Sequence, residues 1–255
     1  MNTSNRLLEK LNSGEFIYTA EYLPPAGTDC SSIAKYLVPF SGKLAAVNVA
    51  DNHYGIAMSS FAASLAVKNI GFEPILQLAT RDRNRFALQS DLLGAASLGI
   101  NNVLCLTGIH PQTLGWNESS GIFELDSSRL IEVVKKMNNG TLLDGRQMDG
   151  NFSMLIGAVV NPYMMPQEFN LIRFSKKINA GADFVQTEAV FDVETFEQWL
   201  YAVGESGITG KVAILAGVLP LESLEQAVRL REKFSDVTIP DFVIERLSSA
   251  GGPEA

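Results

Sequence analysis

A run of charged and amide side chains, Thr80-Arg81-Asp82-Arg83-Asn84-Arg85, directly follows an apolar segment. That segment, Ile75–Ala79, has the composition of a buried strand, and small and apolar residues at helical spacing follow from Phe86 to Ala96. The carboxyl end of a parallel strand presents such a cluster to a ligand. Three arginines there could bind an anion in a chain whose net charge is −8. The alternative is a solvent-exposed helix start that Asp82 caps.

Two carboxyl groups stand out because they lie in apolar surroundings. Glu21 lies within Ile17–Leu23, just before two prolines. Desolvation favours the neutral form of a carboxyl, so we predict that Glu21 donates a proton near neutral pH as a general acid. The alternative is a carboxylate paired with one of the arginines that follow Ala79. Glu188 either accepts hydrogen bonds from a polar heterocycle or pairs with a cation.

The composition excludes several classes of function. The chain has 255 residues, of which 46% are hydrophobic and 19% charged, as in an ordinary globular protein. Its acidity argues against nucleic acid or an anionic membrane as a partner. Two cysteines, Cys30 and Cys105, and two histidines, His53 and His110, form no metal-binding pattern, so we expect no metal. Dinucleotide-binding and phosphate-loop glycine motifs are missing. A polar N-terminus and short apolar runs predict a cytoplasmic location.

Short apolar segments alternate with amphipathic helical patterns. Because the apolar segments lack polar alternation, we expect strands buried on both faces of a parallel sheet. The expected strands are Phe16–Leu23, Ala45–Ala50, Glu73–Ala79, Asn102–Thr107, Met154–Val160, Ala182–Val190 and Val212–Val218. The expected helices are Ser31–Val38, Ser59–Asn69, Arg85–Leu98, Ser127–Met137, Met165–Asn179, Val193–Glu205 and Glu222–Phe234.

Seven such units in succession predict an α/β fold of the TIM (β/α)8 type over residues 15–255, after an N-terminal helix or extension over residues 1–14. The eighth unit is not readable, since only a helical pattern from Asp241 to Ser249 follows. We favour a truncated C-terminus over a barrel that stays open or is closed by another chain. An open seam favours self-association or a partner. The long irregular stretch His110–Asp126 could be a lid.

Several motifs, in order and at barrel spacing, resemble the methylenetetrahydrofolate reductase family from about Glu15 to Leu247. They are Ala20–Pro25, Asn48–Asn52, Thr80–Arg85 with Ala87–Asp91, Leu106–Gly108, Asn161-Pro162, Lys177–Asp183 and Gly217–Pro220. The resemblance implies a TIM barrel that binds FAD in an extended pose. It also implies that the reduced flavin passes a hydride to 5,10-methylenetetrahydrofolate and gives 5-methyltetrahydrofolate.

The resemblance further implies roles for individual residues. Glu21 matches the general acid that helps to open the imidazolidine ring to an iminium. Substrate contacts are expected at Gln186, Glu188 and Leu224. Flavin contacts are expected at Gln77, Thr80, Arg81, Asp82, Asn84, Arg85, Thr107, Gly108, Asn161 and Lys177. The arginines and Lys177 would neutralise the pyrophosphate.

Four positions depart from the family pattern. Ile109 replaces an aspartate that touches flavin and pterin, and Gln77 replaces a histidine. Glu188 replaces a glutamine, and Leu224 replaces a phenylalanine that stacks on folate. A carboxylate at position 188 suits the amino-pyrimidine edge of a pterin, so Glu188 could substitute for the lost aspartate.

Three functions remain open at this point. The first is a flavin-dependent reductase of one-carbon metabolism that receives electrons from NAD(P)H or from a second subunit. The second is a flavin-independent reductase in which NAD(P)H reduces the same substrate directly, which the changes at Gln77 and Ile109 favour. The third is a non-catalytic folate-binding or assembly subunit, which Ile109 and the missing strand favour and Glu21 opposes. Tetrahydrofolate is the expected ligand, and a homo-oligomer or an electron-delivering subunit the expected assembly.

Overall fold

The computed structural model describes residues 5–208, 212–234 and 237–250. The chain divides into two compact units. The first comprises Met1–Ala158 with Ala180–Ala182, and the second comprises Val159–Asn179 with Asp183–Ala255. The sequence predicted a single barrel over residues 15–255, and that boundary stays a prediction.

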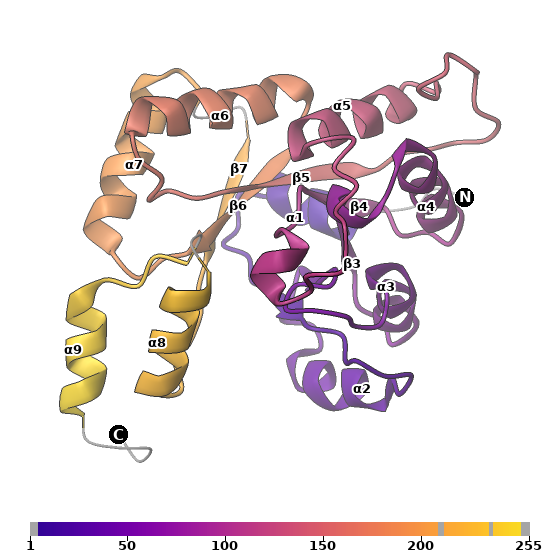
Figure 1. Ribbon diagram of the computed structural model, residues 1–255. Helices are drawn as coiled ribbons and strands as arrows, with labels where there is room; N and C mark the ends of the chain where they lie inside the picture. Colours follow the sequence, from indigo (N-terminus) through magenta and orange to yellow (C-terminus); the bar gives the residue numbers. More distant parts are fainter. Residues whose placement is uncertain (1–4, 209–211, 235–236, 251–255) are drawn as a thin grey trace. The chain divides into compact units, whose positions relative to one another are not determined.

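The first unit is built on parallel strands that are neighbours in chain order, from β1 to β5. Figure 1 labels β3, β4 and β5 of this sheet. These strands are β1 (Thr19–Tyr22), β2 (Ala46–Val49), β3 (Pro74–Ala79), β4 (Asn102–Leu106) and β5 (Leu155–Val160). Its helices and single turns are α1 (Arg6–Asn12), α2 (Ser31–Leu37), η1 (Val38–Phe40), α3 (Ser60–Asn69), η2 (Thr80–Asp82), α4 (Arg85–Ser97), η3 (Pro111–Leu114) and α5 (Ser127–Asn138).

The two faces of this sheet carry different chemistry at β1 and β2. Tyr22 and Val49 are register partners and pack in a buried cluster with Ile33 of α2 and Val67 of α3. Successive side chains of a strand point to opposite faces. The residues that alternate with this apolar set therefore point away from the helices, and Glu21 is one of them.

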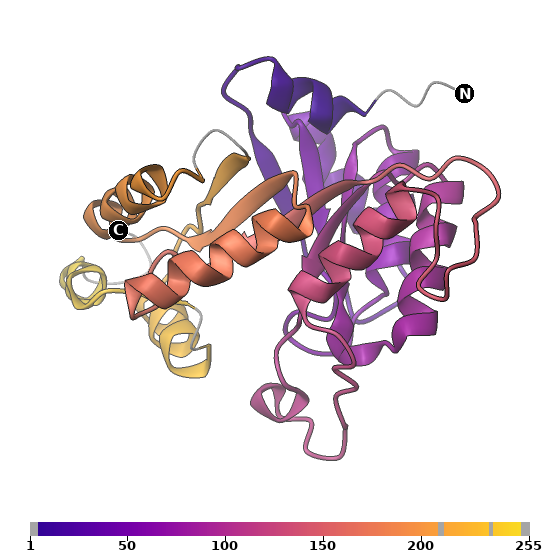
Figure 2. The same ribbon diagram turned by 90° about the horizontal axis from the view of Figure 1, so that it is seen from above.

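Helix α1 lies at the amino ends of the strands. Asn5 donates a side-chain hydrogen bond of 2.8 Å to Asn102, the first residue of β4, and Leu7 is fully buried. The turn η3 follows the carboxyl end of β4, and Figure 2 shows α1 and η3 at opposite ends of the first unit. This leaves the carboxyl ends of the strands to the loops that carry the candidate site.

The second unit contains the parallel strands β6 (Phe184–Ala189) and β7 (Ala213–Gly217). Its helices are α6 (Gln167–Ala180), α7 (Val193–Glu205), α8 (Leu224–Lys233) and α9 (Asp241–Ser249). Phe174 of α6 and Trp199 of α7 are buried in its core with ring centroids 5.6 Å apart. A large aromatic pair thus packs these two helices together.

The predicted α/β class of TIM type is confirmed, because every predicted strand and helix is present in parallel order. The largest difference between predicted and observed strands is at β1, which begins at Thr19 instead of Phe16. Residues 237–250 hold only the short helix α9, so truncation of the chain stays a prediction. Among the described helices, none has the length and apolar character needed to cross a bilayer.

Candidate functional site

Glu21 and Gln77 are joined on the face of the sheet that the helices do not cover. The Nε2 atom of Gln77 donates a hydrogen bond of 2.7 Å to the Oε1 atom of Glu21. Gln77 lies on β3 and is buried, whereas Glu21 lies near the carboxyl end of β1. The structure therefore anchors the predicted acid to a neutral amide from the middle of the sheet.

The predicted surroundings of Glu21 were wrong. Its side chain is exposed, although it follows an apolar segment, because β1 turns Tyr22 toward the helices and Glu21 away from them. The alternative, an ion pair with an arginine after β3, was also wrong. Those arginines have carboxylates of their own, and the partner of Glu21 is Gln77.

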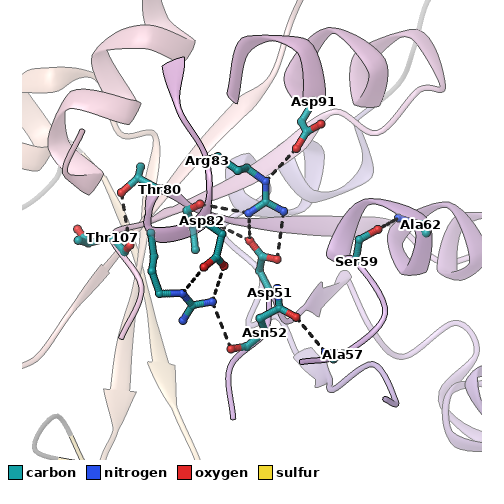
Figure 3. A network of polar contacts seen from close by, with 12 residues as sticks. Asp51, Asn52, Ala57, Ser59, Ala62, Thr80, Asp82, Arg83, Asp91 and Thr107 are labelled. Carbon is teal, nitrogen blue, oxygen red and sulfur yellow. Dashed lines mark hydrogen bonds and ion pairs between the residues drawn. The ribbon is translucent and has the colours of Figure 1, made fainter. Parts of the chain in front are cut away.

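Arg83 is the centre of a partly buried ion-pair network (Figure 3). Its Nη1 atom lies 2.6 Å from Asp51, and its Nε atom lies 2.9 Å from Asp91 of α4. The side chain of Asp51 is completely buried and also accepts the backbone N–H of Ala79. Burial lowers the pKa of Arg83, but the charges and hydrogen bonds of the two aspartates outweigh it, so the net pKa is raised. The charge of Arg83 is thus neutralised by Asp51 and Asp91 within the protein.

Arg81 joins three loops at the carboxyl ends of the strands. Its guanidinium binds Asp82 through two atoms, at 2.8 and 2.6 Å, and donates to the backbone oxygen of Ile109 at 3.1 Å and of Asn52 at 3.5 Å. Burial raises the pKa of Asp82, but the hydrogen bonds and charge of Arg81 outweigh it, so the net pKa is lowered. Arg81 therefore ties the loops after β2 and β4 to η2.

Position 108, in the loop after β4, requires a glycine because the side chain of Arg81 packs directly against it. Its φ angle is +89°, and a Cβ atom there would lie 2.9 Å from the Cβ of Arg81 and 3.2 Å from that of Ala79. The side chain of Arg81 therefore fills the space that the missing Cβ leaves.

We expect Gly108→Ala to lower the free energy of unfolding by more than the roughly 1–2 kcal/mol that a left-handed backbone costs. Gly145→Ala is the matched control, because Gly145 has a φ angle of +90° with no atom within 4 Å of the added Cβ. Urea denaturation of both variants measures the difference. Equal losses would show that the contact with Arg81 is not tight.

The other polar residues of the run and of the β4 loop also have partners. Thr80 donates to the backbone oxygen of Leu125 at 2.7 Å, and Thr107 accepts the backbone N–H of Ser127. Asn84 accepts from the backbone N–H of Ala87 and is the N-cap of α4. The suggested cap at Asp82 was wrong, because η2 intervenes and moves the helix start two residues along.

Arg85 is the most accessible arginine of the run. Its side chain is 58% exposed and lies 3.6 Å from the carboxylate of Glu124, which also accepts the backbone N–H of Arg85 at 3.1 Å. A carboxylate thus occupies the first turn of α4, where the helix dipole favours an anion. The predicted flavin contact at Arg85 stays a prediction.

A cavity of about 230 Å³ opens between the loops after β1 and β2. It is lined by Leu23, Pro24 and Ala26 from the first loop and by Ala50 and residues 52–57 from the second. Asn52 shapes this loop, because its side chain accepts the backbone N–H of Ala57 at 2.9 Å (Figure 3). The volume is below the roughly 300 Å³ of a typical small-molecule site, so the cavity by itself does not identify a ligand site.

The remaining predicted residues belong to the second unit. Asn161 follows β5 and accepts the backbone N–H of Tyr163, and Lys177 of α6 donates to the backbone oxygen of Val159. Gln186 and Glu188 lie on β6, where the pairing with β7 is irregular between Gln186 and Ala189, and both are half-buried. Leu224 is the first residue of α8. Their predicted ligand contacts stay predictions.

Sequence reasoning did not assign Asp51 or Asp91 a role as a counter-ion. The signal that could have found them is the excess of arginines directly after a buried strand, because a buried guanidinium requires a carboxylate nearby. Among the described residues, no group of three or more histidine, cysteine or acidic side chains could hold a metal ion.

Comparison with known proteins gives one consistent family. The profile described as "Methylenetetrahydrofolate reductase" matches residues 6–253. A probable methylenetetrahydrofolate reductase (NADPH) of Caenorhabditis elegans is 28% identical over 193 residues, which are 74% of this chain and 26% of the relative. The 5,10-methylenetetrahydrofolate reductase of Escherichia coli K12 is 27% identical over 140 residues, or 55% of this chain and 40% of the relative. The chain therefore spans well under half of these relatives.

A solved structure shows the same fold. An uncharacterized protein from Clostridium thermocellum, which binds two copies of 5-methyl-5,6,7,8-tetrahydrofolic acid, matches with a TM-score of 0.67. The match covers 95% of this chain and 79% of that protein at 14% sequence identity. At this identity the likeness supports the fold alone.

Proposed function

Because the chain belongs to the methylenetetrahydrofolate reductase family, we propose that it reduces 5,10-methylenetetrahydrofolate to 5-methyltetrahydrofolate. The observation that carries the proposal is Glu21, a carboxyl group at the carboxyl end of β1 that Gln77 holds in place. The family match over nearly the whole chain supports the same reaction.

Glu21 provides the proton for this reaction. It donates the proton to a nitrogen of the imidazolidine ring, whose bond to the methylene carbon breaks and leaves an iminium. The methylene carbon then accepts a hydride and becomes the methyl group, while the proton stays on the nitrogen that the carbon left. A pterin ring over Glu21 would exclude water while the proton is transferred. Exposure of Glu21 in the free protein is compatible with this role. Gln186, Glu188 and Leu224 are the proposed substrate contacts.

A reduced flavin, when bound, supplies the hydride. Arg85 and the first turn of α4, where Glu124 lies in the free protein, would hold one of its phosphates. Thr80, Thr107 and Gly108 shape the loops after β3 and β4. Contacts of Asn161 and Lys177 with the flavin are proposed from the family resemblance alone. NAD(P)H or a second subunit supplies the electrons.

Purified protein tests this proposal directly. We expect the visible absorbance of a bound flavin after isolation or reconstitution with FAD, and formation of 5-methyltetrahydrofolate when NADH or a chemical reductant is added. Failure to reduce 5,10-methylenetetrahydrofolate, both with reduced flavin and with NAD(P)H alone, would contradict the proposed reaction.

One observation favours a second candidate, direct reduction by NAD(P)H without flavin. The side chains of Thr80, Arg81 and Thr107, predicted to contact flavin, all have partners inside the protein. Turnover by colourless protein with NAD(P)H alone would support this candidate over the flavin-dependent one.

A further inference from the structure

Glu21 and Gln77 lie on strands that are not neighbours. Strand β2 separates β1 from β3, so their backbones are roughly 9–10 Å apart. The register places Asn48 opposite Glu21. It also pairs Val49 with Leu76, so Gln77 lies level with the residue after Val49, which is the small Ala50. The bond of 2.7 Å is therefore made by two long side chains that meet over the end of β2.

Gln77 is buried in the sheet, whereas its partner Glu21 is exposed. Gln77 is 5% exposed, within a strand in which every residue is buried. The side chain of Glu21 is exposed. Among the described residues, the side-chain amide of Gln77 makes a hydrogen bond only to Glu21, and the Nε2 atom of Gln77 is the donor. The contact with the buried Gln77 therefore orients Glu21 through its Oε1 atom and leaves the other carboxyl oxygen accessible to a ligand.

We propose that Gln77 is a positioning residue that holds Glu21 in both of its protonation states, an inference that rests on the function proposed above. A carboxamide carries a donor and an acceptor at the same distance from the backbone. Nε2 donates to the Oε1 atom of Glu21 in the structure, a contact that suits the carboxylate form. A half-turn about the last side-chain bond instead presents the amide oxygen, which accepts the O–H of the protonated acid. Glu21 thus keeps its place before and after it gives up its proton.

On the part of the sheet around Glu21, Gln77 is surrounded by uncharged side chains. The residues that share its face are Asn48 and Ala50 from β2, Ile75 and Gln77 from β3, and Thr19 from β1. All of these side chains are uncharged. A lysine or arginine at position 77 could donate a hydrogen bond to Glu21 but could not accept the O–H of the protonated acid.

Nuclear magnetic resonance of the full-length protein tests the contact without any substrate. The side-chain amide resonances of Gln77, assigned by their loss in Gln77→Met, are followed while the pH is lowered through the titration of Glu21. We expect them to shift in the wild type and to stay still in Glu21→Gln. Resonances that do not respond to Glu21, or that shift equally in Glu21→Gln, would overturn the proposal.

Kinetics then test the positioning role. Gln77→Met keeps the length of the side chain and removes both hydrogen-bonding atoms. We expect it to lower kcat about 100-fold with little change in KM, and to cause no further loss in the Glu21→Gln background. Gln167→Met, at an exposed position of α6, is the control and should be unchanged. Full kcat in Gln77→Met, or an equal loss in both backgrounds, would overturn the proposal.

The outcomes of the two experiments distinguish a failure of the proposed function from a failure of the positioning role. A wild-type protein that shows the amide shifts but reduces no methylenetetrahydrofolate would contradict the proposed function, while the contact between Gln77 and Glu21 would stand. A protein that reduces the substrate but shows neither the shifts nor the loss of kcat would contradict the positioning role alone.

Discussion

Replacement of Glu21 by glutamine is expected to lower kcat for methylenetetrahydrofolate reduction by about 10²–10⁴-fold, the range that a general acid contributes. Glutamine has nearly the same shape and keeps an oxygen for the Nε2 atom of Gln77. It has no acidic proton to give to the ring nitrogen. The loss should appear in kcat and much less in KM, because the substrate still fits. Single-turnover measurements with reduced enzyme give the rate of this step.

Glu15→Gln provides the control for this prediction. Glu15 is exposed, lies ahead of β1 and pairs with Lys10 at 2.6 Å, away from Gln77. It should leave the rate unchanged. Wild-type turnover by Glu21→Gln would mean that another group or water donates the proton. Tetrahydrofolate binding without any turnover in the wild type would instead support a binding subunit.

Replacement of Arg83 by methionine is expected to lower the free energy of unfolding by about 3–5 kcal/mol, the cost of leaving a buried charge unpaired. The side chain of Asp51 is 0% exposed and that of Arg83 is 13% exposed. Methionine keeps much of the apolar stem but leaves Asp51 without its cation. Urea denaturation monitored by fluorescence measures the change.

Two further variants separate this structural role from ligand binding. Arg83→Met combined with Asp51→Asn should recover part of the loss, because the second change removes the uncompensated charge. Arg85→Met should cost less than about 1 kcal/mol, as expected for an exposed pair, and should weaken flavin binding. A loss of stability at Arg85 as large as that at Arg83 would contradict the distinction between the two arginines.

The arginine run shows what sequence reasoning could and could not reach. Its location after a buried strand was predicted correctly, because apolar composition and helix-forming residues define β3 and α4 locally. Its chemistry was not predicted. The partner of Arg83 lies 32 positions away on the loop after β2, and no local pattern identifies it. Only Arg85 keeps the exposed position that the sequence suggested for an anion-binding group.

Glu21 gives the same contrast. The sequence identified the residue and its strand, but an apolar neighbourhood in the chain does not fix the face on which a side chain lies. Strand alternation turned Tyr22 toward the helices and left Glu21 exposed. Its partner, Gln77, is 56 positions away and was expected to contact a cofactor instead.

The sequence by itself determined the alternation of strands and helices, the α/β class and the family, because these depend on hydrophobic periodicity and on motifs within short segments. The tertiary structure alone decided which carboxylates neutralise Arg81 and Arg83, which amide holds Glu21, and which arginine stays accessible. The physical reason is that strand register brings distant residues within 3 Å of one another. Hydrogen bonds and ion pairs act only at that range.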